Sequence, residues 1–410
     1  MSSHSSTYGA MDNIKPPPTI PSGRPKTQVS SVQVQHPGYA GINILLRLPA
    51  VDSTASPADD GRVVCGIHHP TLHTACAIVA DNRFDGYLST RKQSDSPGRI
   101  DREEQGVIPA GVYYYHVPRT GTGREEESGP YPVVPSFDDW SFPDGPLPPI
   151  WTELDDAQAE FSTSDATEDP FCMVTGHQTE IQVAHVVPSV KADWFTRNAM
   201  GRFCADYDTS GRQGLNDRLN TLRLRSDIHQ VWDRSKFALV PKRDDRGKVR
   251  LVSHVLGTLP DFLSDYHNRA TIIPQSHCSS AMLFARFALQ ILAGVLPFFP
   301  LTVQRAVKIR SVDGSFRVQN LDRFAIPAFR PRSRTPSPRK KRFASPPDET
   351  SAMDEILGSD AESESHAGSL NDSVVDESKE ESILVTEGYC DDAGFKTFTL
   401  RGRKRQRSDR

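Results

Sequence analysis

The sequence lacks closely paired cysteines and any sign of a leader. Its six cysteines include no Cys-x-x-Cys pair, which argues against a disulfide framework and against a four-cysteine zinc site. The N-terminus is polar and proline-rich, without the apolar core of a signal peptide. We therefore expect an intracellular protein in a reducing compartment.

Long apolar runs are equally scarce. The longest, from Ala281 to Leu301, is interrupted by Arg286, Gln290 and two prolines. We interpret it as a buried helix and not as a membrane span, so we expect no membrane partner.

Net charge is also small, because 48 Lys and Arg face 52 Asp and Glu. This balance excludes a uniformly basic nucleic-acid coat, and any function that depends on charge must be local. Hydrophobic residues make up 36% of the chain, against 24% charged residues, so only part of it is expected to form a core.

The chain divides by composition into four ranges. We predict an α+β protein with a disordered arm at 1–35, a β-rich domain at 36–165, strands and helices at 166–325 and a disordered charged tail at 328–410. In the tail, fifteen acidic residues and one lysine lie between Asp348 and Asp392. Basic clusters at 339–342 and 401–407 flank this stretch and are typical of nuclear-import signals, so we expect a nuclear location.

Short apolar runs between turn residues predict strands at 42–48, 75–80, 112–117 and 131–134. A hairpin is predicted from 237–241 and 248–252, and apolar residues at helical spacing predict a core helix from Met282 to Val295. His68, His69 and His73, near Gly66 and Pro70, are interpreted as a polar loop, and 120–129 as a charged loop.

Two histidines stand in positions that suit chemistry. Alternation at 181–184 predicts a short strand that ends at His185, and Ser226 or Asp227 can cap a helix with Ile228, Val231 and Trp232 toward the core. His229 and Asp233 then share one face of that helix, where they form either a surface ion pair or a ligand pair. Asn220 precedes His229 by nine residues.

A strand ending in His, a loop with Asn and a helix with His resemble the ββα-metal, or HNH, nuclease motif. Residues 36–300 resemble the HNH-nuclease-domain proteins of filamentous fungi. The resemblance is carried by phrases at 46–50, 74–78, 82–86, 130–137, 184–188, 224–229 and 283–287.

The resemblance implies an endonuclease that hydrolyses phosphodiester bonds with a divalent ion, Mg²⁺, Mn²⁺ or Zn²⁺. It implies that His185 is the general base, that His229 binds the ion with help from Asp233, and that Asn220 fixes the loop, although Asn216 is also near. Ala184 stands where many members have a metal-binding Asp or His. The cysteine pairs of zinc-containing relatives are missing, because Thr175, Arg225 and Ile228 occupy three of the four positions, so no structural zinc is expected.

The implied partner is nucleic acid, and we expect DNA rather than RNA. From Arg197 to Arg250, thirteen Lys or Arg face seven Asp or Glu, an excess that favours nonspecific phosphate contacts. The candidate contacts are Arg223, Arg225, Arg234 and Lys236. Two alternatives remain: a catalytically degenerate HNH fold that only binds nucleic acid, and a scaffold whose range 36–165 binds proteins.

Overall fold

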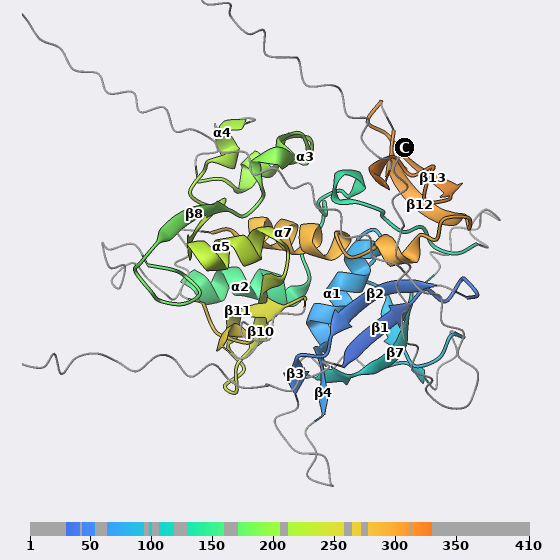
Figure 1. Ribbon diagram of the computed structural model, residues 1–410, viewed down its shortest axis with the longest axis horizontal. Coiled ribbons are helices and arrows are strands. Elements are labelled where there is room, and N and C mark those ends of the chain that lie inside the picture. Colours follow the sequence, from blue (N-terminus) through green and yellow to red (C-terminus); the bar gives the residue numbers. More distant parts are fainter. Residues whose placement is uncertain are drawn as a thin grey trace, which may run out of the picture. The chain divides into compact units, whose positions relative to one another are not determined.

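The computed structural model describes residues 30–41, 43–53, 64–93, 98–100, 106–118, 129–159, 171–205, 212–257, 265–271, 278–311 and 313–329. Most of the predicted arm, most of the loop at 120–129 and the tail from residue 330, with both basic clusters, lie outside these ranges. The described part is a mixed α/β structure of several small sheets and few helices (Figure 1).

The N-terminal part of the chain contains a four-stranded sheet with the strand order β2-β1-β7-β5. Its strands are β1 (Ser31–Gln35), β2 (Ile44–Pro49), β5 (Tyr87–Ser89) and β7 (Gly111–His116). Val32 and Val34 are fully buried and alternate with polar residues, because successive strand side chains point to opposite faces. The predicted arm is therefore wrong for residues 31–35, which lie between two partner strands.

A smaller antiparallel sheet, β3-β4-β6, contains Asp52–Ser53, Cys65–His68 and Val107–Pro109. It leads directly into helix α1 (His69–Val79), so the strand predicted at 75–80 is wrong. Leu72, Ala75 and Val79 are fully buried at helical spacing. A short apolar run that is buried all round fits either element, and Pro70 in the first turn favours the helix. The polar loop predicted around His69 is wrong for the same reason.

The second half of the chain contributes two further ribbons and the longest helix. The predicted hairpin is confirmed as β10 (Phe237–Arg243) and β11 (Val249–Val255), and the predicted core helix as α7 (Ser280–Leu292). The hairpin of β12 (Arg305–Arg310) and β13 (Phe316–Leu321) was not predicted. The remaining elements are α2 (Pro149–Ala159), α3 (Ala192–Arg197), α4 (Arg212–Leu215), η3 (Phe137–Asp139), η5 (Ser189–Lys191), η6 (Met200–Phe203), η8 (Leu296–Phe298), η9 (Pro327–Phe329) and the site elements given below.

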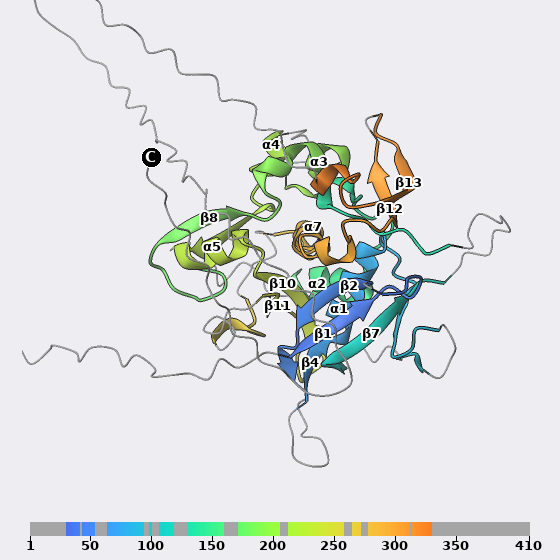
Figure 2. The ribbon, with the colours of Figure 1, turned by 45° about the vertical axis from the view of Figure 1, so that its right-hand side comes forward.

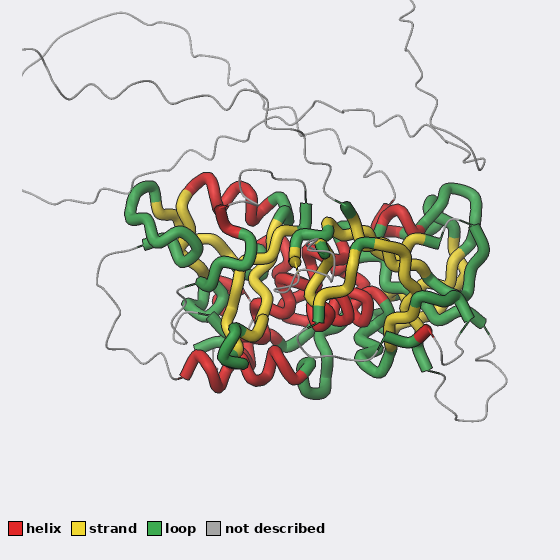
Figure 3. The backbone as a smooth tube through the Cα atoms, turned by 90° about the horizontal axis from the view of Figure 1, so that it is seen from below, coloured by secondary structure: helices red, strands yellow, loops and turns green. Residues whose placement is uncertain are grey.

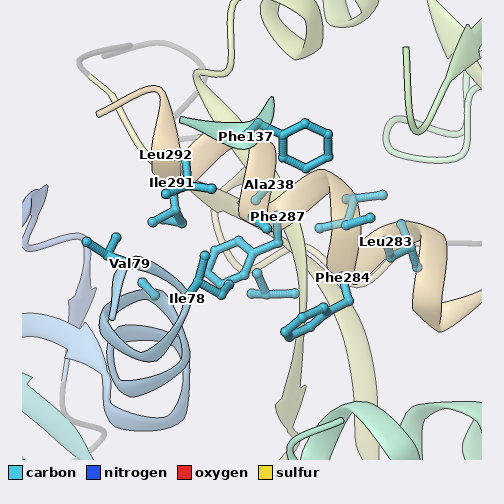
Figure 4. Packing of buried hydrophobic residues seen from close by; sticks show 14 of the residues in the cluster. Ile78, Val79, Phe137, Ala238, Leu283, Phe284, Phe287, Ile291 and Leu292 are labelled. Atoms are coloured by element: carbon cyan, nitrogen blue, oxygen red, sulfur yellow. The ribbon is translucent and has the colours of Figure 1, made fainter. Parts of the chain in front are cut away.

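Helix α7 joins the two halves. It contacts α1, α2 and β10, and Figure 4 shows Phe284, Phe287 and Ile291 of α7 among side chains from α1 and β10. Burying each such side chain contributes about 1.5 to 3 kcal/mol. The buried hydrophobic residues of both halves form one cluster, and strands lie on both sides of the central helices (Figure 3). The boundary predicted at 165/166 is therefore spanned by a shared core.

Among the described residues, no helix combines the length and the apolar character that crossing a membrane requires.

Candidate functional site

A two-stranded antiparallel ribbon carries the first candidate histidine. It consists of β8 (Ile181–His185) and β9 (Thr221–Arg225), with His185 opposite Thr221, and helix α5 (Ser226–Asp233) contacts both strands (Figure 2). The predicted strand at 181–184 is confirmed. The second strand was missed, although Leu222 and Leu224 alternate with polar residues and are buried.

Helix α5 begins differently from the prediction. Neither Ser226 nor Asp227 is the N-cap; Arg225 holds that position, and its side chain makes no capping hydrogen bond. Asp227 instead accepts two hydrogen bonds from the Arg225 guanidinium, at 2.7 and 2.8 Å. A strand that runs directly into a helix leaves no room for a separate capping residue.

His185 ends β8 and belongs to the outward face of the ribbon. Its Nε2 lies 3.1 Å from Asn216 Oδ1, so Nε2 donates and Nδ1 keeps its lone pair. Its carbonyl accepts a hydrogen bond of 3.1 Å from Trp232 Nε1 on α5. Asn216 thus fixes the ring tautomer of His185, and Trp232 connects the end of β8 to α5.

Asn220 is fully buried and holds the chain that follows His185. Its Oδ1 accepts from the amide of Val187 at 2.8 Å, and its Nδ2 donates to the carbonyls of Val187 and Leu215 at 3.1 and 2.8 Å. The two nearby asparagines therefore differ in their contacts: Asn216 contacts the imidazole, whereas Asn220 contacts only backbone.

His229 and Asp233 form a pair on α5. His229 Nε2 lies 3.4 Å from Asp233 Oδ2, and its Nδ1 lies 2.9 Å from Gln182 Oε1. Because Gln182 presents an oxygen, Nδ1 carries a proton. In the neutral ring the lone pair of Nε2 then faces a carboxylate oxygen, whereas in the protonated ring Nε2 forms an ion pair with it. The lone pair and the carboxylate oxygen repel each other unless a cation or a second proton lies between them.

This pair fits a divalent ion. Two ligands at about 2.1 Å from one ion lie about 3 to 3.5 Å apart, which matches the observed separation. The bond to Gln182 is the outer contact that commonly orients a metal-binding histidine. Ala184, on the same face of β8 as Gln182, is fully buried and adds no ligand.

Residues 172–240 match the family model of HNH endonucleases. The matched range contains His185, Asn220, His229 and Asp233. It supports an HNH-domain protein, and such a domain indicates nuclease activity on nucleic acid. No curated protein and no solved structure matches the chain.

Arg286 of α7 lies outside the matched range but contacts the residues that follow β8 and end α5. It was not predicted as a site residue. It is 2% exposed, donates to the carbonyls of Val186 and Trp232, and lies 4.3 Å from the Trp232 ring centre. Burial lowers the pKa of Arg286 to about 10, so it remains charged. The sequence did contain a signal for this residue. Arg286 is the single charged residue of a largely apolar helix, and a buried charge needs partners.

The four predicted nucleic-acid contacts have different surroundings. Arg223 pairs across the ribbon with Val183, which is 63% exposed, on the face that also carries His185. Arg225 is engaged by Asp227, and this hydrogen bonding raises the pKa of Arg225. Arg234 and Lys236 follow α5, and both are exposed. The four side chains thus differ in exposure and in the partners that they contact.

The two histidines are linked through backbone and not by direct contact. The pleat of β8 puts Gln182, the partner of His229, and His185 on opposite faces. Three of the cavities among the described residues have volumes of about 140 to 330 Å³, and neither His185 nor His229 lines these three. Val183, on the same face of β8 as His185, is 63% exposed, so this face of the ribbon is open to solvent.

One group of three possible metal ligands occurs among the described residues, and it lies away from the HNH match. Asp52, His254 and His267 bring ligand atoms within 4.8 Å of one another. The ammonium of Lys242 lies against them, 2.6 Å from Asp52 Oδ1 and 3.0 Å from His254 Nδ1. With Asn268, these residues are called the Lys242 cluster below.

Proposed function

We propose that the protein is a metal-dependent HNH endonuclease that hydrolyses phosphodiester bonds of nucleic acid, DNA in preference to RNA. The observation that carries the proposal is the 3.4 Å separation of His229 Nε2 and Asp233 Oδ2, where a neutral imidazole turns a lone pair toward the carboxylate, inside the range that matches HNH endonucleases. A cation removes this repulsion, and a nuclease needs a cation near its scissile phosphate.

His185 is the proposed general base. Asn216 holds Nε2 as the donor, so Nδ1 can accept a proton from water. Asn220 keeps the loop after His185 in place through its three side-chain bonds.

His229 and Asp233 are the proposed metal ligands, and Gln182 orients His229. A bound Mg²⁺, Mn²⁺ or Zn²⁺ would supply a Lewis acid for the charge that develops on the phosphate. Two protein ligands leave several positions for water and substrate oxygens, an arrangement typical of Mg²⁺ sites.

Arg223 and Arg234 are the proposed phosphate contacts beside His185 and α5. They can bind the backbone of nucleic acid without reading its sequence.

We also propose an intracellular, nuclear location from the basic clusters of the tail.

The test is a plasmid-nicking assay with Mg²⁺, Mn²⁺ or Zn²⁺. His185→Ala should lower the rate by about 10²- to 10⁴-fold, the range of general-base catalysis. His177→Ala is the matched control, because His177 is an exposed histidine in the same matched range. Equal nicking by His185→Ala and the wild type would overturn the proposal.

A second candidate is an HNH fold that binds nucleic acid without cleaving it. It is favoured by Ala184, whose buried methyl group adds no ligand on the face where Gln182 meets His229. Binding to plasmid or single-stranded DNA without nicking in any of the three metals would select it. Neither binding nor nicking would point to a protein scaffold.

A further inference from the structure

The Lys242 cluster places an amine beside a carboxamide. Lys242 of β10 is 8% exposed, and its Nζ donates to Asp52 Oδ1 at 2.6 Å, His254 Nδ1 at 3.0 Å and Asn268 Oδ1 at 2.7 Å. Three acceptors saturate an ammonium group, so the nitrogen is held in one position.

Asp52 connects the amine to the amide nitrogen. The same oxygen, Oδ1, that accepts from Lys242 also accepts from Asn268 Nδ2 at 2.8 Å. It accepts a third bond from His267 Nε2 at 3.0 Å, and Oδ2 accepts from the backbone amide of His68 at 2.7 Å. Asp52 Oδ1 therefore accepts hydrogen bonds from both Lys242 Nζ and the amide nitrogen of Asn268, Nδ2.

A metal ion fits this cluster poorly. The Lys242 ammonium already lies where a cation would sit among Asp52, His254 and Asn268. A divalent ion would place two further positive charges against it, in surroundings of low dielectric constant. The four hydrogen bonds to Asp52 also use the lone pairs that an ion would need.

We propose that Lys242 and Asn268 form an intramolecular isopeptide bond, with Asp52 as the proton carrier. Before any reaction, Lys242 Nζ lies 2.7 Å from the carboxamide oxygen of Asn268, and Asp52 Oδ1 contacts both side chains. Such contact in a fixed orientation can replace a large part of the activation barrier.

The step needs no outside reactant. One proton of the Lys242 ammonium passes to Asp52 Oδ1, and the free amine bonds to Cγ of Asn268. Asp52 delivers that proton to Nδ2, and the Cγ–Nδ2 bond breaks. A second proton from Lys242 passes through Asp52 to the departing ammonia, so an ammonium and a primary amide become a secondary amide and ammonium ion.

Burial favours two parts of this step. It lowers the pKa of Lys242, which eases formation of the free amine. Burial also lowers the pKa of His254, so its neutral ring can accept from Nζ and hold the amine. For Asp52, by contrast, the raising effect of burial is outweighed by the hydrogen bond from His267 and the charges of His254 and Lys242, which hold its pKa well below the usual range, so each proton stays on Asp52 only in passing. Asn268 is exposed as a residue, which gives the released ammonia a path to solvent.

The experiment is an intact-mass measurement on the full chain under denaturing conditions, directly after purification and after prolonged incubation. The wild type should be lighter than its calculated mass by one ammonia. A tryptic digest should contain a branched peptide that joins Lys242 to Asn268. The branch excludes a succinimide at Asn268, which also loses ammonia but does not involve Lys242.

Three variants sharpen the result. Lys242→Arg and Asn268→Ala should have their full calculated masses, and Asp52→Asn should slow or abolish the loss of ammonia. Lys248→Arg, in the turn of the same hairpin, should behave as the wild type. A wild-type chain at full mass at every time point, without the branched peptide, overturns the proposal even if a variant fails to fold. An Asn268→Ala chain that still loses ammonia overturns it as well.

Discussion

The Lys242 cluster and the HNH region use the same kinds of side chain in opposite surroundings. Both combine histidines, a carboxylate and a carboxamide. In the cluster, the side chains of Asp52 and Lys242 are 3% and 10% exposed and saturated with hydrogen bonds. In the HNH region, the side chains of His229 and Asp233 are 22% and 62% exposed. Buried side chains with all hydrogen bonds made suit a structural role or a single internal reaction. Repeated catalysis instead needs side chains that a substrate can reach and lone pairs that can accept a proton or bind an ion.

The largest expected effect of a change in the cluster is on stability. In the chain without the isopeptide bond, Asp52→Ala leaves the buried Lys242 charge without its carboxylate, which should lower the free energy of unfolding of that chain by about 3 to 5 kcal/mol. Urea denaturation measures this change. The nicking rate per folded molecule should stay unchanged. Asp313→Ala, at an exposed carboxylate that accepts from Ser315 and pairs with Arg317, is the comparison and should lower stability much less.

Acid should destabilise the N-terminal sheet through His36. Burial lowers the pKa of His36 to about 4, and the neutral ring donates to Tyr131 O and accepts from the Gly38 amide. Between pH 6.5 and 4, the unfolded chain binds a proton at this histidine that the folded chain does not. Stability therefore falls as pH decreases through this window, by roughly 3 kcal/mol in all.

Urea midpoints between pH 7.5 and 4 test this expectation. His36→Phe keeps an aromatic ring against Tyr131 but cannot titrate, so its stability should depend less on pH than that of the wild type. An unchanged pH dependence in this variant would assign the acid sensitivity to other buried histidines, such as His254.

Removing the orienting amide should weaken metal binding at the proposed site. Gln182→Leu deletes the acceptor that fixes the His229 tautomer, and loss of such an outer contact typically costs about 10- to 100-fold in metal affinity. Titration with Mn²⁺ measures it. Gln230→Leu, at an exposed glutamine of the same helix, is the control. Equal affinities for the two variants would contradict the ligand role of His229.

The smallest effect is expected in the salt dependence of DNA binding. Arg223→Ala should weaken binding and reduce the slope of log K against log salt by about 1. Arg225→Ala should change the slope less, because Asp227 already engages this guanidinium. The reverse order would show that Arg225 leaves Asp227 to bind phosphate.

Local patterns predicted much of the fold. The β10–β11 hairpin and helix α7 follow from apolar periodicity and from a polar turn, which act over a few residues. Helix α1 was mistaken for a strand because its short, fully buried run has no polar face to reveal its period. Strand β1 was missed because only its pairing with β2 and β7 makes its two valines a core.

The sequence likewise predicted part of the candidate site. His185, Asn220 and His229 could be named because their order along the chain is the motif itself. Gln182, Trp232 and Arg286 acquire their roles only through contacts across 47 to 100 residues of sequence. The Lys242 cluster was invisible for the same reason, since Asp52 and Lys242 are separated by 190 residues.

The contacts of Arg286 limit how the protein can be dissected. This guanidinium reaches the end of β8 and the end of α5 from a helix that begins 40 residues after the family match ends. A fragment cut at residue 240 would expose the Trp232 ring and leave two inward-facing carbonyls without their donor. The matched range is therefore not expected to fold alone, and α7 belongs to the smallest unit in which the proposed activity should be assayed.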